Sequence, residues 1–302
     1  MRFFRSCLLL SAVLGVASAF STFCSGQDDS QSNAFNVMSF NVRLATKSDG
    51  DNYWDNRKET LVEVVKESDP LLLGVQEALP PQKKYLDETL KGYRSIGVGR
   101  EDGKDTGEIM AIFYKEDALE LLDSGTFWLS ETPEKPSKGW DAECFRTATW
   151  GNFKCKKTGK EFVYCNTHLD HVGTAAREKG AQLLLQKGWE LTNHGEFPYF
   201  VTGDFNVTEK SEAYRAITQG VDDVPGLIDT NKIAKEREIA QNYTFHNWGK
   251  VKPEKGLIID FIFVNDRVNV EKFKINPVKH SNGRFASDHV SIVATLSFKY
   301  SI

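Results

Sequence analysis

The sequence predicts an α/β protein in which two β-sheets pack together and helices cover the outside. Short apolar segments typical of strands alternate with amphipathic segments typical of helices. Hairpin and crossover connections both occur along the chain, which indicates mixed sheets. From Ala34 onward the chain has no linker, repeat or low-complexity stretch, so we expect a single domain over residues 34–302.

Four elements are expected in the first part of this domain. Leu61, Val64 and Val65 have the spacing of a buried helix face, and Asp69-Pro70 would end that helix. The expected segments are strand Phe35–Val42, helix Asn56–Ser68, and strands Leu71–Val75 and Glu108–Tyr114.

The second part begins with a hairpin and continues with a long helix. Lys157–Lys160 is the expected turn, and counting back from it places Cys155 opposite Phe162. We therefore expect no disulfide between Cys155 and Cys165. The expected segments are strands Ala148–Lys154 and Glu161–Thr167, helix Thr174–Asn193, and strands Tyr199–Thr202, Leu257–Val264 and Val290–Phe298.

The N-terminus has the pattern of an export signal. After a short basic stretch, the apolar run from Cys7 to Phe20 has 14 residues, fewer than the ~18 that cross a membrane. Ala17-Ser18-Ala19 matches a signal-peptidase site, so residues 1–19 would be removed and residues 20–33 would form a flexible leader. We expect a periplasmic or secreted protein with no transmembrane segment after cleavage. A lipid anchor on Cys24 is the alternative.

Composition and charge are those of an ordinary globular protein. Of the 302 residues, 40% are hydrophobic and 26% are charged. The net charge of −4 gives no overall positive field that would hold a phosphate backbone. Nucleic acid is a possible substrate, but the net charge gives no support for it. We expect a monomer.

Polar side chains lie at or near the ends of several apolar strands. Catalytic groups in α/β sheets gather at the carboxyl ends of strands. Carboxylate and amide oxygens without cysteine suit Mg²⁺ or Mn²⁺. The carboxylate of Asp260 is expected inside an apolar strand, where it is costly unless paired. The candidate residues are Asn41, Glu77, His168, Asp204, Asn206, Asp260, Asp288 and His289. Each has a structural explanation when it stands alone, such as an Asx turn at Asp204.

Six blocks of sequence carry these candidates: SFNVR, QE, NTHLDH, GDFN, IDFIF and SDH. In this order they resemble the endonuclease/exonuclease/phosphatase superfamily, and the resemblance extends over Asn36–Val290. It implies a four-layered α/β sandwich, with two mixed sheets face to face, and metal-dependent hydrolysis of a phosphoester. Stretches such as WLSETP and TFHN make the chain most similar to exported bacterial members.

The resemblance also implies roles for the metal and water sites. Glu77, helped by Asn41 and Asp288, would hold the Mg²⁺ or Mn²⁺ ion. Asp204 and Asn206 would orient the attacking water or bind the phosphate.

The remaining candidates would act on the phosphate. His289 would contact the phosphate or activate water, with Asp260 fixing its tautomer. His168 would donate to the phosphoryl group or to the leaving oxygen. Arg146 is a candidate second phosphate clamp, because a guanidinium group matches phosphate bidentately. Whether His289 or Asp204 is the base stays open.

The expected function is an exported Mg²⁺- or Mn²⁺-dependent phosphoesterase that hydrolyses a phosphodiester, such as nucleic acid or a phospholipid head group. One alternative is a phosphomonoesterase acting on inositol or sugar phosphates. The other is an inactive binding protein that keeps the fold, although no candidate residue is missing. The aromatic residues Phe127, Trp128, Tyr243, Phe245 and Trp248 are interpreted as core or as a stacking wall, rather than as a membrane anchor.

Overall fold

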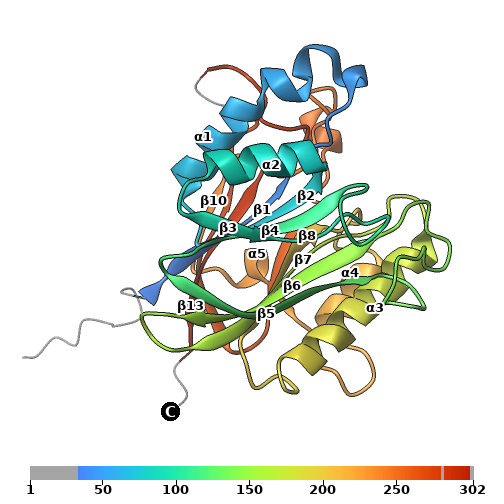
Figure 1. The fold of residues 1–302 in the computed structure, drawn as a ribbon, viewed down its shortest axis with the longest axis vertical. Helices are drawn as coiled ribbons and strands as arrows, with labels where there is room; N and C mark the ends of the chain where they lie inside the picture. Colours follow the sequence, from blue (N-terminus) through green and yellow to red (C-terminus); the bar gives the residue numbers. More distant parts are fainter. Residues whose placement is uncertain (1–32, 280–281, 300–302) are drawn as a thin grey trace, which may run out of the picture.

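The computed structural model describes residues 33–279 and 282–299, so the expected signal peptide and Cys24 lie outside the described residues. Two mixed sheets pack face to face, and helices cover both outer faces (Figure 1). The predicted fold class is therefore confirmed. Within the described ranges, no helix is long and apolar enough to cross a membrane.

The seven-stranded sheet contains both the first and the last strand of the fold. In sheet order its strands are β10 (Glu236–Ile239), β12 (Val268–Ile275), β13 (Ile292–Phe298), β1 (Phe35–Asn41), β2 (Leu72–Ala78), β4 (Ile109–Lys115) and β3 (Tyr93–Ile96). Strand β1 runs parallel to β2 and antiparallel to β13. The C-terminal ends of β1 and β2 therefore reach the same edge of this sheet.

The six-stranded sheet holds the central part of the chain. In sheet order its strands are β5 (Leu119–Trp128), β6 (Thr147–Cys155), β7 (Glu161–His168), β8 (Tyr199–Asp204), β11 (Asp260–Val264) and β9 (Ile228–Asp229). Strands β7 and β8 are parallel, and β11 is antiparallel to β8. The end of β7, the end of β8 and the start of β11 therefore lie side by side.

Three apolar clusters hold the layers together. Side chains of both sheets, including the stacked rings of Phe153, Phe162 and Phe200, fill the space between them. A second cluster lies between the seven-stranded sheet and two helices, and a third between the six-stranded sheet and two others. The helices are α1 (Lys58–Ser68) and α2 (Pro80–Thr89) on the first sheet, α3 (Thr174–Leu191) and α4 (Glu212–Gln219) on the second, and the short α5 (Thr230–Ile233).

The predicted elements are all present, but several others were not predicted. Strands β3, β5, β9 and β10 are edge strands, where one side of the backbone has no partner and fewer side chains are buried. The sequence analysis also missed α2, α4, α5 and β12. The hairpin register is corrected as well: Phe153 pairs with Phe162, and Cys155 donates its N–H to Lys160. Cys155 and Cys165 are nevertheless both free thiols, as expected.

Candidate active site

The candidate residues of the six-stranded sheet occupy one row of its register. His168, the last residue of β7, pairs with Asp204, and Asp204 pairs with Asp260. Asp260 is thus the first residue of β11, which corrects the prediction that it lies inside a strand beginning at Leu257. In the other sheet, Asn41 pairs with Gln76, next to Glu77.

The start of β11 is displaced because a loop competes for the preceding backbone. The hydroxyl of Thr244 accepts hydrogen bonds from the N–H groups of Ile259 and Asp260, at 3.0 and 3.2 Å. The carbonyl of Leu257 accepts from the N–H groups of Thr244 and Phe245. The carbonyl of Leu257 and the N–H of Ile259 therefore bond to the Thr244–Phe245 segment, while the carbonyl of Ile259 accepts from the N–H of Phe205 after β8.

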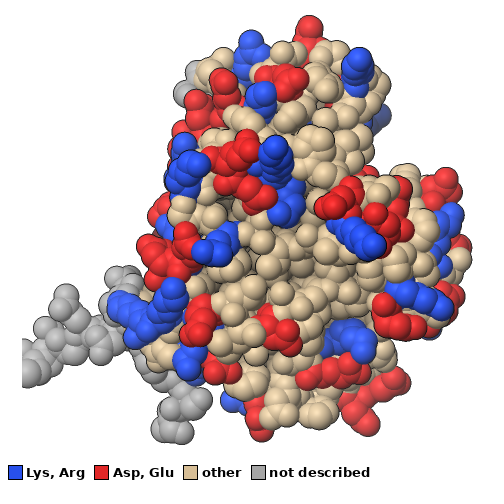
Figure 2. Space-filling view, viewed as in Figure 1, with Lys and Arg blue, Asp and Glu red and all other residues tan. Residues whose placement is uncertain are grey.

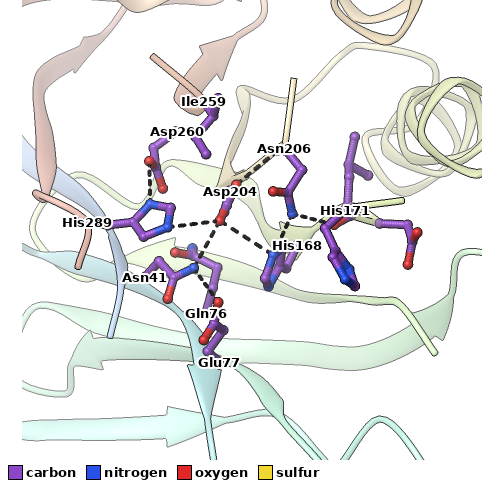
Figure 3. A network of polar contacts seen from close by, with 12 residues as sticks. Asn41, Gln76, Glu77, His168, His171, Asp204, Asn206, Ile259, Asp260 and His289 are labelled. Atoms are coloured by element: carbon purple, nitrogen blue, oxygen red, sulfur yellow. Dashed lines mark hydrogen bonds and ion pairs between the residues drawn. The ribbon is translucent and has the colours of Figure 1, made fainter. Parts of the chain in front are cut away.

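Asp204 is the centre of the polar network (Figure 3). Its Oδ2 accepts a hydrogen bond from Nδ2 of Asn41 at 2.9 Å. The same oxygen lies 3.4 Å from Nε2 of His168 and 3.6 Å from Nε2 of His289. Its Oδ1 accepts from the backbone N–H of Asn206 at 2.9 Å. The structure therefore gathers these candidates around a single carboxylate.

His289 lies between two buried carboxylates. Its Nδ1 is 2.9 Å from Oδ2 of Asp260, and its Nε2 faces Asp204. Burial alone would lower the pKa of His289, but Asp260 and Asp204 outweigh burial and raise it to about 10. Burial and the repulsion from Asp260 raise the pKa of Asp204 above its usual range. At neutral pH the His289 ring is therefore a cation whose orientation Asp260 fixes.

Glu77 and Asp288 form an acidic wall around Arg43. The Glu77 carboxylate accepts hydrogen bonds from Nδ2 of Asn41 at 2.9 Å and from the N–H of Leu44 at 3.1 Å. Arg43 lies 3.9 Å from Glu77 and 3.8 Å from Asp288. Arg43 and Glu77 both have left-handed backbone angles, with φ of 55° and 63°. Such strained conformations persist where surrounding contacts enforce them, often at functional sites.

The acidic groups on either side of Asn41, Glu77 and Asp204, fit a hard divalent cation. Glu77, His168 and Asp204 have ligand atoms within 4.8 Å of one another, and carboxylate oxygens dominate the donor set. Oδ1 of Asn41 accepts a hydrogen bond from the N–H of Arg43 in this structure. The amide nitrogen of Asn41 donates to both Glu77 and Asp204 and so bridges these two carboxylates. The direct contact of Asn41 with a metal, like that of Asp288, stays a prediction.

A second group of cavity-lining residues carries positive charge. Nε of Arg146 donates to Asp170 at 3.2 Å, and its Nη2 contacts Nδ1 of His171 at 2.9 Å. Cys144, Asp170 and His171 have ligand atoms within 4.8 Å of one another. Arg146 already contacts both Asp170 and His171, and its positive charge lies where a metal ion would bind. This group therefore does not fit a cation. It fixes the guanidinium instead.

His168 is a neutral donor in this site. Nδ2 of Asn206 donates to Nε2 of His168 at 2.9 Å and also to the carbonyl of Leu169, which sets the orientation of the amide. Burial, followed by the charges of Arg146 and Arg100, lowers the pKa of His168. Since Nε2 accepts, the ring proton lies on Nδ1.

Most of the predicted residues line one cavity of about 570 Å³, namely Glu77, Arg146, His168, Asp204, Asn206, Asp288 and His289. Asn41 and Asp260 do not line it and contact its wall from behind, through Asp204 and His289. Sequence reasoning missed four arginine, glutamate or histidine residues of its wall: Arg43, Arg100, Glu108 and His171. Arg43 and His171 lie within the blocks SFNVR and NTHLDH, so the sequence carried a signal for them. Arg100 and Glu108 lie in a polar stretch that belongs to none of the blocks. Burial and repulsion from Glu77 raise the pKa of Glu108 to about 7, against the opposing effect of Arg100 and Arg146. Of the five aromatic candidates, Phe245 lines the cavity and the other four are buried.

The chain matches known proteins over most of its length. A family model described as "Endonuclease/Exonuclease/phosphatase family" matches residues 38–289. A solved family protein from Bacteroides vulgatus is 40% identical, covers 88% of this chain and 99% of its own, and has a TM-score of 0.83. One from Bacteroides thetaiotaomicron is 39% identical, with coverages of 88% and 98% and a TM-score of 0.81.

A third similar structure has a named activity. It is the mannosyl-6-phosphatase of Bacteroides thetaiotaomicron VPI-5482, which is 38% identical, covers 87% of this chain and 100% of its own, and has a TM-score of 0.80. With the fold and the gathered acidic and histidine residues, these matches identify the chain as a member of the endonuclease/exonuclease/phosphatase family of metal-dependent phosphoester hydrolases.

Proposed function

We propose that this protein is a Mg²⁺- or Mn²⁺-dependent phosphatase that removes the phosphate from a small organic phosphomonoester. The observation that carries the proposal is that two residues of the cavity wall, His168 and Arg146, each have a buried nitrogen without a partner in the described part of the chain. Nδ1 of His168 and Nη1 of Arg146 have no hydrogen-bond partner among the described residues. A buried donor without an acceptor costs about 1–3 kcal/mol. Phosphate oxygens would satisfy both donors.

Three further observations favour a small monoester over the phosphodiester expected from the sequence. The cavity has a volume in the range of sites for small organic ligands. The face shown in Figure 2 mixes acidic and basic side chains and has no continuous basic stripe for a nucleic-acid backbone. The mannosyl-6-phosphatase that this chain resembles acts on a phosphomonoester.

In this proposal Glu77 holds the metal, with Asn41 and Asp288 beside it. The bound ion would polarise a phosphate oxygen and neutralise charge that develops on the leaving oxygen. Asn41 keeps the Glu77 carboxylate in place by donating to its Oε1. Arg43 balances part of the negative charge of the wall.

The remaining residues act on the attacking water and on the phosphate oxygens. His289 stays protonated and donates to a phosphoryl oxygen, since Asp260 stabilises its charge. Asp204, whose pKa is raised, orients the attacking water and accepts its proton. Asn206 positions both Asp204 and His168 through its backbone and side-chain N–H groups. His168 and Arg146 donate to the remaining phosphate oxygens.

The test is a substrate panel with Mg²⁺ and with a chelator. The panel contains a hexose 6-phosphate, myo-inositol 1-phosphate, p-nitrophenyl phosphate, bis(p-nitrophenyl) phosphate, single-stranded DNA and sphingomyelin. We expect metal-dependent phosphate release from monoesters, with kcat/KM at least about 100-fold above that for the diesters. Asp204→Asn, measured in parallel, should abolish the release. Efficient cleavage of a diester with inert monoesters would overturn the proposal in favour of a phosphodiesterase.

A further inference from the structure

We propose that Arg100 and Glu108 form a subsite that binds neighbouring hydroxyl groups of the substrate, beside the phosphate. The inference rests on the proposed function and narrows its substrate class. The leaving group would be a polyhydroxylated compound, either a sugar or a cyclitol.

The two side chains form a nearly buried ion pair on the cavity wall. Nη1 of Arg100 donates to Oε2 of Glu108 at 2.7 Å, and the side chains are 11% and 10% exposed. Nε of Arg100 is buried and has no partner among the described residues. The pair uses only Oε2 of the carboxylate, so Oε1 remains an acceptor. Arg100 therefore keeps an unused donor, and Glu108 keeps an unused acceptor.

The loop between β3 and β4 is built to hold this pair in place. Asp102 accepts hydrogen bonds from the N–H and the hydroxyl of Thr106, which closes the loop. Gly99 is required where the loop crosses itself, because a Cβ there would lie 2.3 Å from the carbonyl oxygen of Thr106. Nε1 of Trp128 donates to the carbonyl of Arg100 at 2.6 Å. Such a fixed loop presents Arg100 at little entropic cost on binding.

Polyol chemistry matches this arrangement. Each hydroxyl group both donates and accepts, so two adjacent hydroxyls can accept from Arg100 and donate to Glu108. The apolar face of a sugar ring also needs a hydrophobic surface, and the half-buried ring of Phe245 lines the same cavity. The cavity volume of about 570 Å³ leaves room for a ring beside the phosphate.

A second ion pair of the same chemistry lies outside the cavity. This matched pair lies at the other end of the same two strands: Nε of Arg94 in β3 lies 2.5 Å from Glu116, just after β4, with side chains 69% and 47% exposed. That pair does not line the cavity. It therefore provides control variants of the same chemistry.

The experiment compares two monoesters that differ in their hydroxyl groups. Steady-state kinetics are measured with a hexose 6-phosphate and with p-nitrophenyl phosphate, which has no hydroxyl beside the ester. Arg100→Met and Glu108→Gln should each lower kcat/KM for the hexose phosphate at least about tenfold more than for p-nitrophenyl phosphate, mainly through KM. Arg146→Met should affect both substrates alike. Arg94→Met and Glu116→Gln should match the wild type.

Several outcomes would overturn the subsite. Equal losses on both substrates with Arg100→Met would make Arg100 a phosphate ligand. A raised Mg²⁺ requirement in Glu108→Gln would make Glu108 a metal ligand. Should Arg100→Met not fold, Arg100→Lys keeps the charge but not the planar fork, and it should show the same selective loss.

Parallel assays with myo-inositol 1-phosphate distinguish a cyclitol from a sugar as the preferred substrate. A selective loss on either polyol phosphate supports the subsite. A wild-type enzyme that hydrolyses p-nitrophenyl phosphate but neither polyol phosphate leaves the proposed function intact and overturns the subsite alone. A wild-type enzyme inert on every monoester overturns both.

Discussion

Nδ1 of His289 lies 2.9 Å from Oδ2 of Asp260, and both side chains are at least 95% buried. Oδ1 of Asp260 has no hydrogen-bond partner among the described residues, so its charge depends chiefly on the imidazolium. A lone buried carboxylate would be far less stable in its ionised form. The two residues therefore behave as one unit.

Asp260→Asn should lower turnover by about 10²–10⁴-fold, because the amide no longer supports the charged ring or its tautomer. The Mg²⁺ concentration for half-maximal activity should stay near the wild-type value. The double variant with His289→Ala should be hardly slower than the slower single variant, since the residues act together. Fully additive losses would show that the pair is not coupled.

The same contact predicts how stability depends on pH. The pKa of His289 is raised from 6.5 to about 10 in the folded state. The stabilisation that the charged ring gives to the folded state is therefore complete below about pH 6.5. That stabilisation is lost as the pH rises toward about 10. Melting temperatures should therefore fall more steeply over this range for the wild type than for Asp260→Asn, in which the folded-state pKa is lower. Parallel melting curves would argue against a charged His289.

Glu77→Gln should raise the Mg²⁺ concentration needed for activity at least about tenfold, which corresponds to roughly 1.4 kcal/mol of binding. The substitution removes one negative charge but keeps the volume and the acceptor for Leu44. A metal titration of activity measures the effect, with the melting temperature as a check on folding. Glu88→Gln, on the exposed surface of α2, is the control. An unchanged titration curve would remove Glu77 from the metal site.

Arg57 is predicted to stabilise the backbone of two segments that carry site residues. It is 2% exposed, lies 5.2 Å from the ring centroids of both Trp54 and Trp248, and donates to the carbonyls of Val42 and Ala286. Burial lowers its pKa to about 10. These two carbonyls flank the Asn41 and Ser287–His289 segments.

Arg57→Met would leave these carbonyls without a donor, so the free energy of unfolding should fall by at least about 2 kcal/mol in denaturant titrations. Arg284→Met is the control, because Arg284 donates to the carbonyl of Asn56 on the exposed surface. A loss of similar size in both variants would contradict this role for Arg57.

We also propose export, on the sequence pattern alone. The precursor expressed in a bacterial host should be processed after Ala19, so N-terminal sequencing should begin at Phe20. Replacing Ala17 and Ala19 with Arg should block processing. A blocked, lipid-modified N-terminus at Cys24 would establish the alternative, and an intact precursor would contradict both.

The sequence by itself determined the features that depend on local pattern. Apolar runs of strand length, each followed by a polar residue, were sufficient to predict β1, β7 and β8 and to name Asn41, His168 and Asp204. The carboxyl ends of adjacent parallel strands share an edge, which explains why His168 and Asp204 meet. Asn41 reaches Asp204 from the other sheet. The six ordered blocks indicated the family, and this resemblance implied the pairing of Asp260 with His289.

Only the tertiary structure decided which groups complete the site. A strand begins where its backbone pairs with a neighbour. Leu257 and the N–H of Ile259 bond to the Thr244–Phe245 segment instead, so β11 begins at Asp260. Edge strands carry too little buried apolar surface to be recognised. Arg100 and Glu108 are eight positions apart in a polar stretch, and a loop closed by its own backbone and by Trp128 places them on the cavity wall. Such contacts depend on partners distant in sequence, and no local pattern encodes them.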